Sequence, residues 1–143
     1  MKSIWFKPVQ VRDTARFSPN TLMETLNIEI TEIGPDFLRG RMPVDKRVHQ
    51  ILGMLHGGAS LALAETLGSL GAVLTLDETK QFCLGQEING NHLRAVTSGY
   101  VIGTARPFHI GSTSQVWGID IRDEQDRPVC ISRITLAVRD RKA

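Results

Sequence analysis

Cysteine is scarce in this sequence, because its 143 residues include only Cys83 and Cys130. A secreted scaffold held together by disulfides would need more cysteines in so short a chain. The two cysteines do not have the spacing of a metal-ligand pair, and none of the four histidines has the helical or loop spacing of a zinc site. We therefore expect two reduced cysteines that pack inside a cytoplasmic protein, with no metal and no bound cofactor.

Charge of one sign is not concentrated anywhere in the chain. There are 17 basic and 15 acidic residues, a net charge of +2, and no basic block is interleaved with aromatic residues. This balance argues against a nucleic-acid partner and fits a small polyanionic ligand. No run approaches the roughly 20 apolar residues of a membrane helix, and the start of the chain lacks the apolar core of a signal peptide. We expect no membrane contact.

The chain has instead a pattern rich in strands around one long apolar helix. Its length suits one domain, residues 1–143. Helices do not alternate with strands, which excludes a doubly wound fold, whereas an α+β fold with an antiparallel sheet curled around a central helix accommodates the order. The pattern predicts a short helix from Ser18-Pro19 to about Leu26, a long helix from Gly57 to about Leu76, and strands at Asn27–Ile33, Phe37–Val44, Phe82–His92, Tyr100–Ile110, Ser114–Arg122 and Val129–Val138.

Glu65 is the single charge within the long helix. The helix is otherwise apolar on nearly all sides, which predicts burial, and Gly68 and Gly71 allow close packing. An unpaired, ionised carboxylate in such a place is costly if it is dry. Glu65 therefore pairs with an arginine, lies on an exposed stripe, or acts as a catalytic carboxylate at a cleft. Ser69 follows one turn later on the same face, where its hydroxyl could orient Glu65 or hold a water.

The start of the long helix, at His56-Gly57-Gly58, is a candidate oxyanion site. The first N–H groups of a helix have no partner within it, and the helix dipole there favours negative charge. The two glycines let a ligand approach the backbone closely, so that the oxygen of a reacting carbonyl could be stabilised. Alternatively, the glycines only form a tight turn into the helix.

Spacing separates these two parts of the site. His56 and Glu65 are about nine residues apart, which along a helix is roughly 13 Å, and at ~100° per residue they point to opposite faces. They cannot both reach one carbonyl carbon within the same chain. A two-fold dimer with antiparallel helices would bring Gly57 of one copy to Glu65 of the other. A single active site therefore requires an oligomer.

Five further polar residues are candidates for ligand binding. Gln50 lies in the loop before the long helix, where its side-chain amide could bind a ligand carbonyl. His92 and Arg94 lie at the end of a predicted strand, and Ser112 and Thr113 lie in a turn between two others. Hydroxyls, backbone amides and an arginine at strand ends can hold phosphates. Ordinary polar turns explain these residues equally well.

Six short motifs, spread from about Gly34 to Val138, resemble those of a known family. The motifs are His56–Ser60, Ala64–Ser69, Met42–Asp45, Gly85–His92, Pro107–Gly111 and Gln115–Trp117. They are similar to the signature of hotdog-fold thioesterases, in the 4-hydroxybenzoyl-CoA thioesterase subgroup that carries its glutamate in the helix. Within that subgroup they look most like the 1,4-dihydroxy-2-naphthoyl-CoA thioesterases of menaquinone biosynthesis.

This resemblance implies a hotdog fold and an enzyme that hydrolyses acyl-CoA thioesters, with aryl or naphthoyl groups favoured. It implies that Glu65 is the nucleophile or the general base and that the Gly57 N–H polarises the thioester carbonyl. Gln50 and His56 would flank the thioester, and Ser69 would assist water or Glu65. The resemblance places Gln50, His56 and Gly57 in one subunit and Glu65 and Ser69 in its partner.

The resemblance also implies that His92, Arg94, Ser112 and Thr113 hold the nucleotide of CoA. It implies a homodimer that assembles further into a homotetramer. The turn here reads Gly-Ser-Thr-Ser at residues 111–114. It lacks the basic residues expected after the serine in the naphthoyl-CoA relatives, so this chain departs from their pattern at the nucleotide.

Two other functions fit the same residues. A hotdog dehydratase or hydratase would use a pair such as His56 and Glu65 on an acyl thioester and would leave the C–S bond intact. A non-catalytic acyl-CoA-binding domain would bind the ester and release no thiol. The lone carboxylate in an apolar helix argues against pure binding, because binding gains nothing from the cost of placing a charge there.

Overall fold

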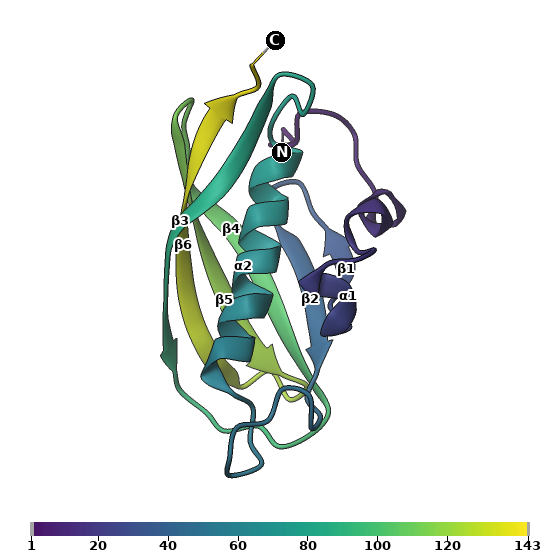
Figure 1. The fold of residues 1–143 in the computed structure, drawn as a ribbon, viewed down its shortest axis with the longest axis vertical. Coiled ribbons are helices and arrows are strands. Elements are labelled where there is room, and N and C mark those ends of the chain that lie inside the picture. The colour runs from purple at the N-terminus through teal and green to yellow at the C-terminus, as the bar shows by residue number, and fades with distance from the viewer. Residues whose placement is uncertain (1, 143) are drawn as a thin grey trace.

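Over residues 2–142, which the computed structural model describes, the chain forms a six-stranded sheet, one long helix and short N-terminal helical segments (Figure 1). The predicted strand limits and the ends of the long helix agree with the structure to within about two residues. In order, the elements are the 3-10 helix η1 (Val11–Phe17), α1 (Leu22–Thr25), β1 (Glu29–Ile33), β2 (Leu38–Pro43), α2 (Gly57–Leu74), β3 (Gln81–His92), β4 (Tyr100–Ile110), β5 (Ser114–Asp123) and β6 (Pro128–Asp140).

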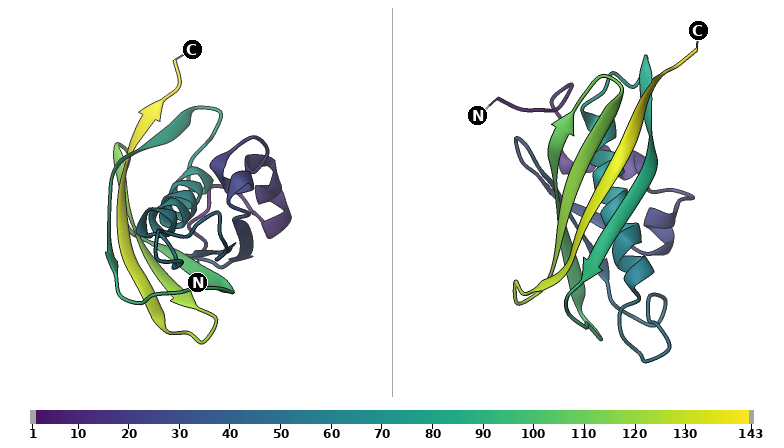
Figure 2. Two further views of the ribbon diagram at one scale, coloured as in Figure 1. Left: turned by 60° about the horizontal axis from the view of Figure 1, so that its bottom comes forward. Right: turned by 90° about the vertical axis from the view of Figure 1, so that its left-hand side faces the viewer.

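The sheet is antiparallel throughout and has the strand order β1-β2-β4-β5-β6-β3. It curls around α2, and the two short N-terminal helices lie beside α2 on the open side of the curl (Figure 2). Buried and half-exposed residues alternate along β5, as they do in a strand with one face on the core. The predicted α+β architecture, a sheet wrapped around one central helix, is confirmed. β3 is an edge strand.

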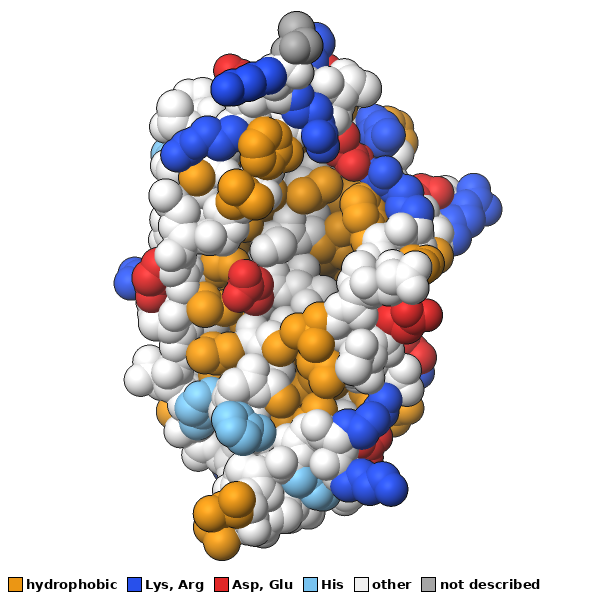
Figure 3. Space-filling view, in the orientation of Figure 1, with side chains coloured by type: hydrophobic (Ala, Val, Ile, Leu, Met, Phe, Trp, Pro, Cys, Tyr) orange, Lys and Arg blue, Asp and Glu red, His pale blue; other side chains and the backbone are white. Residues whose placement is uncertain are grey.

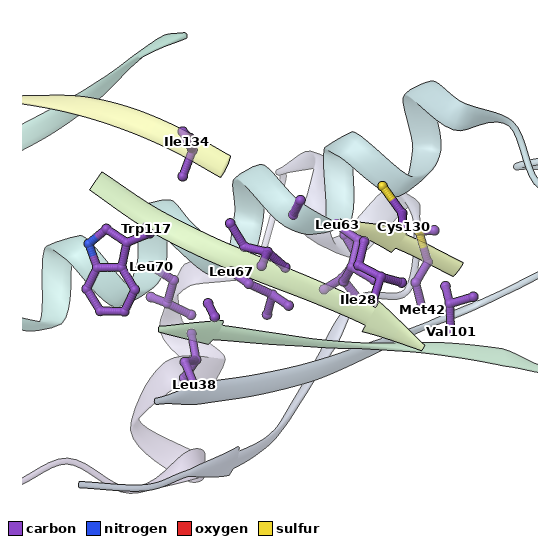
Figure 4. Packing of buried hydrophobic residues seen from close by; sticks show 14 of the residues in the cluster. Ile28, Leu38, Met42, Leu63, Leu67, Leu70, Val101, Trp117, Cys130 and Ile134 are labelled. Carbon is purple, nitrogen blue, oxygen red and sulfur yellow. The ribbon is translucent and has the colours of Figure 1, made fainter. Parts of the chain in front are cut away.

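Two glycines bring α2 close to the sheet. A methyl group at Gly71 would lie 2.7 Å from the ring of Trp117, and one at Gly68 would lie 2.5 Å from Ile134. Trp117 is fully buried, and its indole N–H donates to Gln115 Oε1 over 2.9 Å. The close approach expected from these glycines is therefore present. Figure 4 shows the apolar core that extends from Trp117 along the helix and the sheet, with Ile28, Leu38, Met42, Leu63, Leu67, Leu70, Val101, Cys130 and Ile134.

Only one side of α2 is buried within the chain. The prediction that the helix is buried on nearly all sides is wrong for a single copy, because 50% of the helix is buried and Glu65 is exposed. The sheet curls around one side and leaves the other uncovered. With 18 residues and a mean hydropathy of 1.3, α2 also meets a length and composition criterion for a membrane span, which the sequence analysis did not expect. Its packing against β2 to β6 is that of a core helix.

The predicted helix from Ser18-Pro19 is wrong. Asn20 has a φ of +61°, in the left-handed region, so a right-handed helix cannot run through it. The α-helix begins only at Leu22, after Thr21, and η1 precedes the turn. The short helix is therefore four residues long and starts later than the sequence indicates.

The N-terminal segment packs against the sheet near the C-terminal end of α2. Trp5 stacks on Trp117 with ring centroids 6.3 Å apart, and its indole N–H donates to Gly34 O over 2.8 Å. The Phe6 N–H donates to Leu74 O over 2.9 Å, which satisfies one of the last carbonyls of the helix. Both ends of α2 are thus held, one by this segment and the other by the loop before Gly57.

Close packing at Gly71 predicts that Gly71→Ala destabilises the protein, whereas helix propensity predicts that it stabilises it. We expect Gly71→Ala to lower the free energy of unfolding by about 1–3 kcal/mol, because the methyl overpacks against the Trp117 ring. Propensity alone would raise stability by roughly 1 kcal/mol. Urea unfolding followed by tryptophan fluorescence measures the difference, and a stabilised variant would contradict the packing argument.

Candidate active site

His56 fixes the start of α2. It is the N-cap residue, and its Nδ1 accepts a hydrogen bond from the Gly58 N–H over 2.8 Å. Its own backbone N–H donates to Val48 O over 2.8 Å. Because Nδ1 is an acceptor, the neutral ring carries its proton on Nε2. His56 is exposed, so it presents an N–H donor at the helix start.

The Gly57 N–H is the unsatisfied donor at this helix start. Among residues 2–142 it has no hydrogen-bond acceptor, whereas Gly58, Ala59 and Ser60 each donate to His56. The dipole of an 18-residue helix adds positive potential at the same point. A carbonyl oxygen that gains negative charge in a transition state would be stabilised there. The Gly57 N–H is thus free to donate to a ligand at the start of α2.

Gln50 lies in a tight loop just before the helix. Its backbone N–H donates to Met54 O over 2.7 Å, and the Gly53 N–H returns to Gln50 O over 2.9 Å. Gly53 has a φ of +75°, which this turn requires and glycine supplies. The Gln50 side-chain oxygen accepts from the Leu52 N–H. Its NH₂ group has no partner among residues 2–142, so it can donate to a ligand.

His92 lies directly against the helix start. A Cβ at Gly57 would be 2.6 Å from His92 Nε2, so the imidazole covers the glycine that carries the candidate oxyanion donor. The resemblance implies a role for His92 at the CoA nucleotide, and in the structure its imidazole lies at the start of α2. Histidine side chains gather where α2 begins, on the face seen in Figure 3.

Glu65 lies two turns further along α2. Its side chain is exposed, and within the described chain it forms no ion pair and no hydrogen bond. Of the three sequence interpretations, pairing with an arginine is therefore wrong in the single copy. Figure 3 shows that the surface over α2 is hollowed between apolar side chains on both sides. The Glu65 carboxylate therefore has no partner on the uncovered side of α2 within the described chain.

β3 runs antiparallel beside the uncovered side of α2. Cys83 of this strand contacts the Ser69 carbonyl, with its Sγ 3.9 Å from the oxygen. Burial raises the pKa of the Cys83 thiol to about 11, so at neutral pH it is not a thiolate nucleophile. Four residues of α2 each lie beside a residue of β3, and residue numbers rise along α2 as they fall along β3. The pairs are Gly57 with His92, Leu61 with Gly90, Glu65 with Gly85, and Ser69 with Cys83.

Within a single chain, the predicted site residues form two separate groups. Gly57 and Glu65 both belong to α2, and eight residues of helix separate them by about 12 Å. Gln50, His56, Gly57 and His92 gather at the helix start, whereas Glu65 lies further along with Ser69 one turn beyond it. The separation argued from the sequence is thus present in the structure.

The four residues expected to hold the CoA nucleotide lie at two ends of the sheet. His92 pairs with Cys130 of β6, whereas the Thr113 carbonyl accepts from the Val138 N–H of the same strand. Cys130 and Val138 are about 27 Å apart along an extended strand. His92 and Arg94 are therefore remote from Ser112 and Thr113 within one chain, because the β4–β5 turn lies at the opposite end from the end of β3.

Gly85 is a site residue that the sequence analysis missed. A Cβ at this position would lie 3.0 Å from Glu65 Oε1. An isolated glycine inside a strand pattern indicates a bulge or a close approach, and this signal was present in the sequence. Over the described residues, no group of three or more His, Cys, Asp or Glu side chains could hold a metal ion.

Comparison with known proteins gives the family. The profile of the thioesterase superfamily matches residues 52–130, which include the helix start, Glu65 and β3. A Vibrio cholerae protein named as an esterase is 53% identical over 137 residues, 96% of this chain and 91% of that protein. The proofreading thioesterase EntH of Cronobacter turicensis is 48% identical over 135 residues, 94% of this chain and 98% of its own.

The fold comparison agrees. The crystal structure of a variant thioesterase from Pseudomonas aeruginosa superimposes with a TM-score of 0.95 at 38% identity, covering 97% of this chain and 100% of that one. The sheet wrapped around one long helix is therefore the fold of a thioesterase. This chain belongs to the thioesterase superfamily.

Proposed function

We propose that the chain hydrolyses acyl-CoA thioesters at a site shared between two copies of itself. The observation that supports this is the pair of unsatisfied groups on α2, the Gly57 N–H and the Glu65 carboxylate. A thioester needs an N–H for its carbonyl oxygen and a carboxylate for its carbon or for the attacking water. One chain holds these groups about 12 Å apart, too far for one bond.

A second copy would cover the exposed side of α2 and the free edge of β3. β3 is 12 residues long, lies at the end of the sheet and pairs only with β6. A free edge of this length is a template for pairing with another chain. The adjoining side of α2 has Glu65 as its only charge, among small or apolar residues that are half-exposed: Leu61, Ala62, Thr66, Ser69 and Val73.

The chemistry also gives the position of the two-fold axis. If Gly57 of each copy meets Glu65 of the other, the antiparallel helices cross midway, at Leu61. Leu61 lies beside β3, because a Cβ at Gly90 would be 2.5 Å from Leu61 Cδ2. The two β3 strands would therefore pair antiparallel near Gly90. This pairing would join the two sheets into one and satisfy both edges.

The reaction follows from these positions. The thioester oxygen accepts from the Gly57 N–H of one copy, while the Gln50 amide and the His56 Nε2–H flank the carbonyl as further donors. Glu65 of the other copy either attacks the carbonyl carbon to give an anhydride that water then cleaves, or removes a proton from water as it attacks. Ser69, one turn beyond Glu65, holds the water. In both routes the C–S bond breaks, and the thiolate of CoA leaves and takes up a proton.

The antiparallel arrangement also affects which residues would bind the nucleotide of CoA. It directs the helix start of one copy toward the far end of the other. His92, Arg94, Ser112 and Thr113, which the resemblance assigns to the nucleotide, lie at two ends of the sheet in one copy, so both copies would contribute to nucleotide binding. Aryl or naphthoyl groups, as in menaquinone biosynthesis, are favoured by the resemblance of the sequence motifs. Three half-buried apolar residues, Met54, Leu61 and Phe82, would contact such a group.

A homotetramer would form from two such dimers through the outer face of the sheet. Three large apolar side chains are exposed on this face or at its border: Phe108 at 73%, Ile131 at 54% and Leu93 at 54%. Arginine–carboxylate pairs such as Arg122–Asp120 and Arg106–Asp36 surround them. An apolar centre with a charged border is typical of a protein interface.

Replacement of the carboxylate tests the mechanism. We expect Glu65→Ala to lower kcat by at least about 10³-fold, since the group that attacks or activates water is lost, while the dimer and its thermal stability persist. Release of free thiol from acyl-CoA measures the rate. Glu29→Gln, which changes an exposed carboxylate paired with Arg41 on β1, is the control and should keep full activity. Wild-type rates in the Glu65 variant would exclude Glu65 from the reaction.

Mixing two inactive variants tests the shared site. Gly57→Pro removes the N–H at a helix position where proline is tolerated, and Glu65→Ala removes the carboxylate. After unfolding and joint refolding in equal amounts, half of the dimers are mixed and each has one intact site, so about a quarter of wild-type activity should return. Light scattering and mass spectrometry establish subunit exchange. Complete exchange without recovery would refute a site built from two copies.

A panel of acyl-CoA substrates tests the acyl group. We expect kcat/KM for aroyl-CoA to exceed that for aliphatic acyl-CoA of equal carbon number by at least about tenfold, because a ring fills an apolar pocket more completely. Thiol release distinguishes hydrolysis from hydration, since a hydratase would change a double bond and leave the thioester whole. Equal values across the panel would contradict the aryl preference.

A further inference from the structure

The carboxylate of Glu65 occupies the space that a side chain at position 85 would take. A Cβ on Gly85 would lie 3.0 Å from Glu65 Oε1 and 3.8 Å from its carboxyl carbon. Ordinary contacts between non-bonded carbon atoms are about 3.5–4.0 Å. The other near neighbour, Ile134 Cδ1, would be 3.6 Å away and in ordinary contact. Only the carboxylate would therefore be crowded by a methyl group at this position.

The backbone does not require glycine at position 85. The glycines with positive φ among the described residues are Gly53 and Gly99, so Gly85 has a φ that any residue can adopt. It lies within β3. Glycine weakens a strand because its backbone loses more conformational freedom on folding than that of other residues, and because it has no side chain to pack. The stability of the fold alone favours a side chain here.

A β-bulge follows Gly85 directly. Gly85 pairs with Leu136 and Glu87 with Thr135, so Gln86 is the extra residue that has no partner of its own in β6. A bulge bends its strand and redirects the residues around it, and bulges are frequent next to active sites. This one lies where β3 passes Glu65. The missing side chain at this bend leaves space beside β3 for one oxygen of the Glu65 carboxylate.

We propose that Gly85 is a positioning residue, whose missing side chain beside the bulge leaves the space against β3 in which the reacting carboxylate of Glu65 lies. The proposal rests on the proposed function, in which Glu65 is the reacting carboxylate. A side chain at position 85 moves the carboxylate relative to the thioester without removing it. Gly85 thus acts through Glu65 and does not touch the substrate.

Two substitutions of increasing size test this role. In Gly85→Ala the carboxylate has to give by a few tenths of an ångström, and kcat should fall about 3–10-fold with KM nearly unchanged, since a 1 Å misplacement can cost about 10²-fold. Gly85→Val should lower kcat by about 10²-fold. Both variants should keep the wild-type oligomeric state and melt at or above the wild-type temperature, because alanine and valine stabilise a strand more than glycine does.

A shorter carboxylate provides the matched test of mechanism. In a Glu65→Asp background the carboxylate is withdrawn from β3, so adding Gly85→Ala should change the remaining rate by less than about twofold. Gly118→Ala is the control for a strand glycine. Its added methyl would displace only the exposed ring of Phe108 on the outer face, 2.6 Å away, and kcat should be unchanged when it is measured at the oligomeric state of the wild type.

A readout independent of activity separates this proposal from the proposed function. In crystal structures of the variants, the Glu65 carboxylate should be displaced from β3 in Gly85→Ala, because the added methyl would lie 3.0 Å from Oε1, and should keep its wild-type place in Gly118→Ala. An inactive wild-type protein would refute the proposed function, and the position of the carboxylate would still decide the role of Gly85. Full kcat in both Gly85 variants, an undisplaced carboxylate, or a lower melting temperature that accounts for the lost activity would overturn the role of Gly85.

Discussion

The rigid helix α2 keeps the Gly57 N–H and the Glu65 carboxylate apart, so one copy cannot bring the two proposed reacting groups together. The hydrogen bonds of α2 fix eight residues between Gly57 and Glu65 at about 12 Å, and no side-chain rotation removes that distance. In the proposed mechanism, hydrolysis at one C–S bond therefore needs a second helix with opposite direction. A second copy would cover the uncovered side of α2, pair with the free edge of β3 and bring its Gly57 to the unpartnered Glu65.

The two sides of α2 use glycine for different purposes. On the buried side, Gly68 and Gly71 remove side chains so that the helix lies directly on Ile134 and Trp117. On the uncovered side, Gly57 leaves an N–H open beside His92, and Gly85 of β3 leaves room for the carboxylate. The first pair gives the close packing that keeps the helix in one place, and the second pair depends on that fixed position for its chemistry.

The sequence predicted the elements far better than their contacts. The apolar run from Gly57 and the alternating strands that follow carry strong periodic signals, so the α+β fold and the limits of α2 were predictable. The N-terminal helix was misplaced because Ser18-Pro19 resembles a helix start, while the positive φ of Asn20 depends on the turn around it. The burial of α2 was overestimated because composition shows that a helix is apolar but not whether its own chain or a second copy covers it.

The candidate site shows the same difference between residues within one element and contacts between elements. His56, Gly57 and Glu65 are separated along one helix, so helical geometry alone placed them correctly. His92 comes from a different element, and its contact with Gly57 depends on how β3 crosses α2, which no local pattern encodes. Gly85 was missed for the same reason. The residues that sequence reasoning finds are those whose spacing is set by hydrogen bonds within one helix, whereas the residues that orient them come from the neighbouring strand.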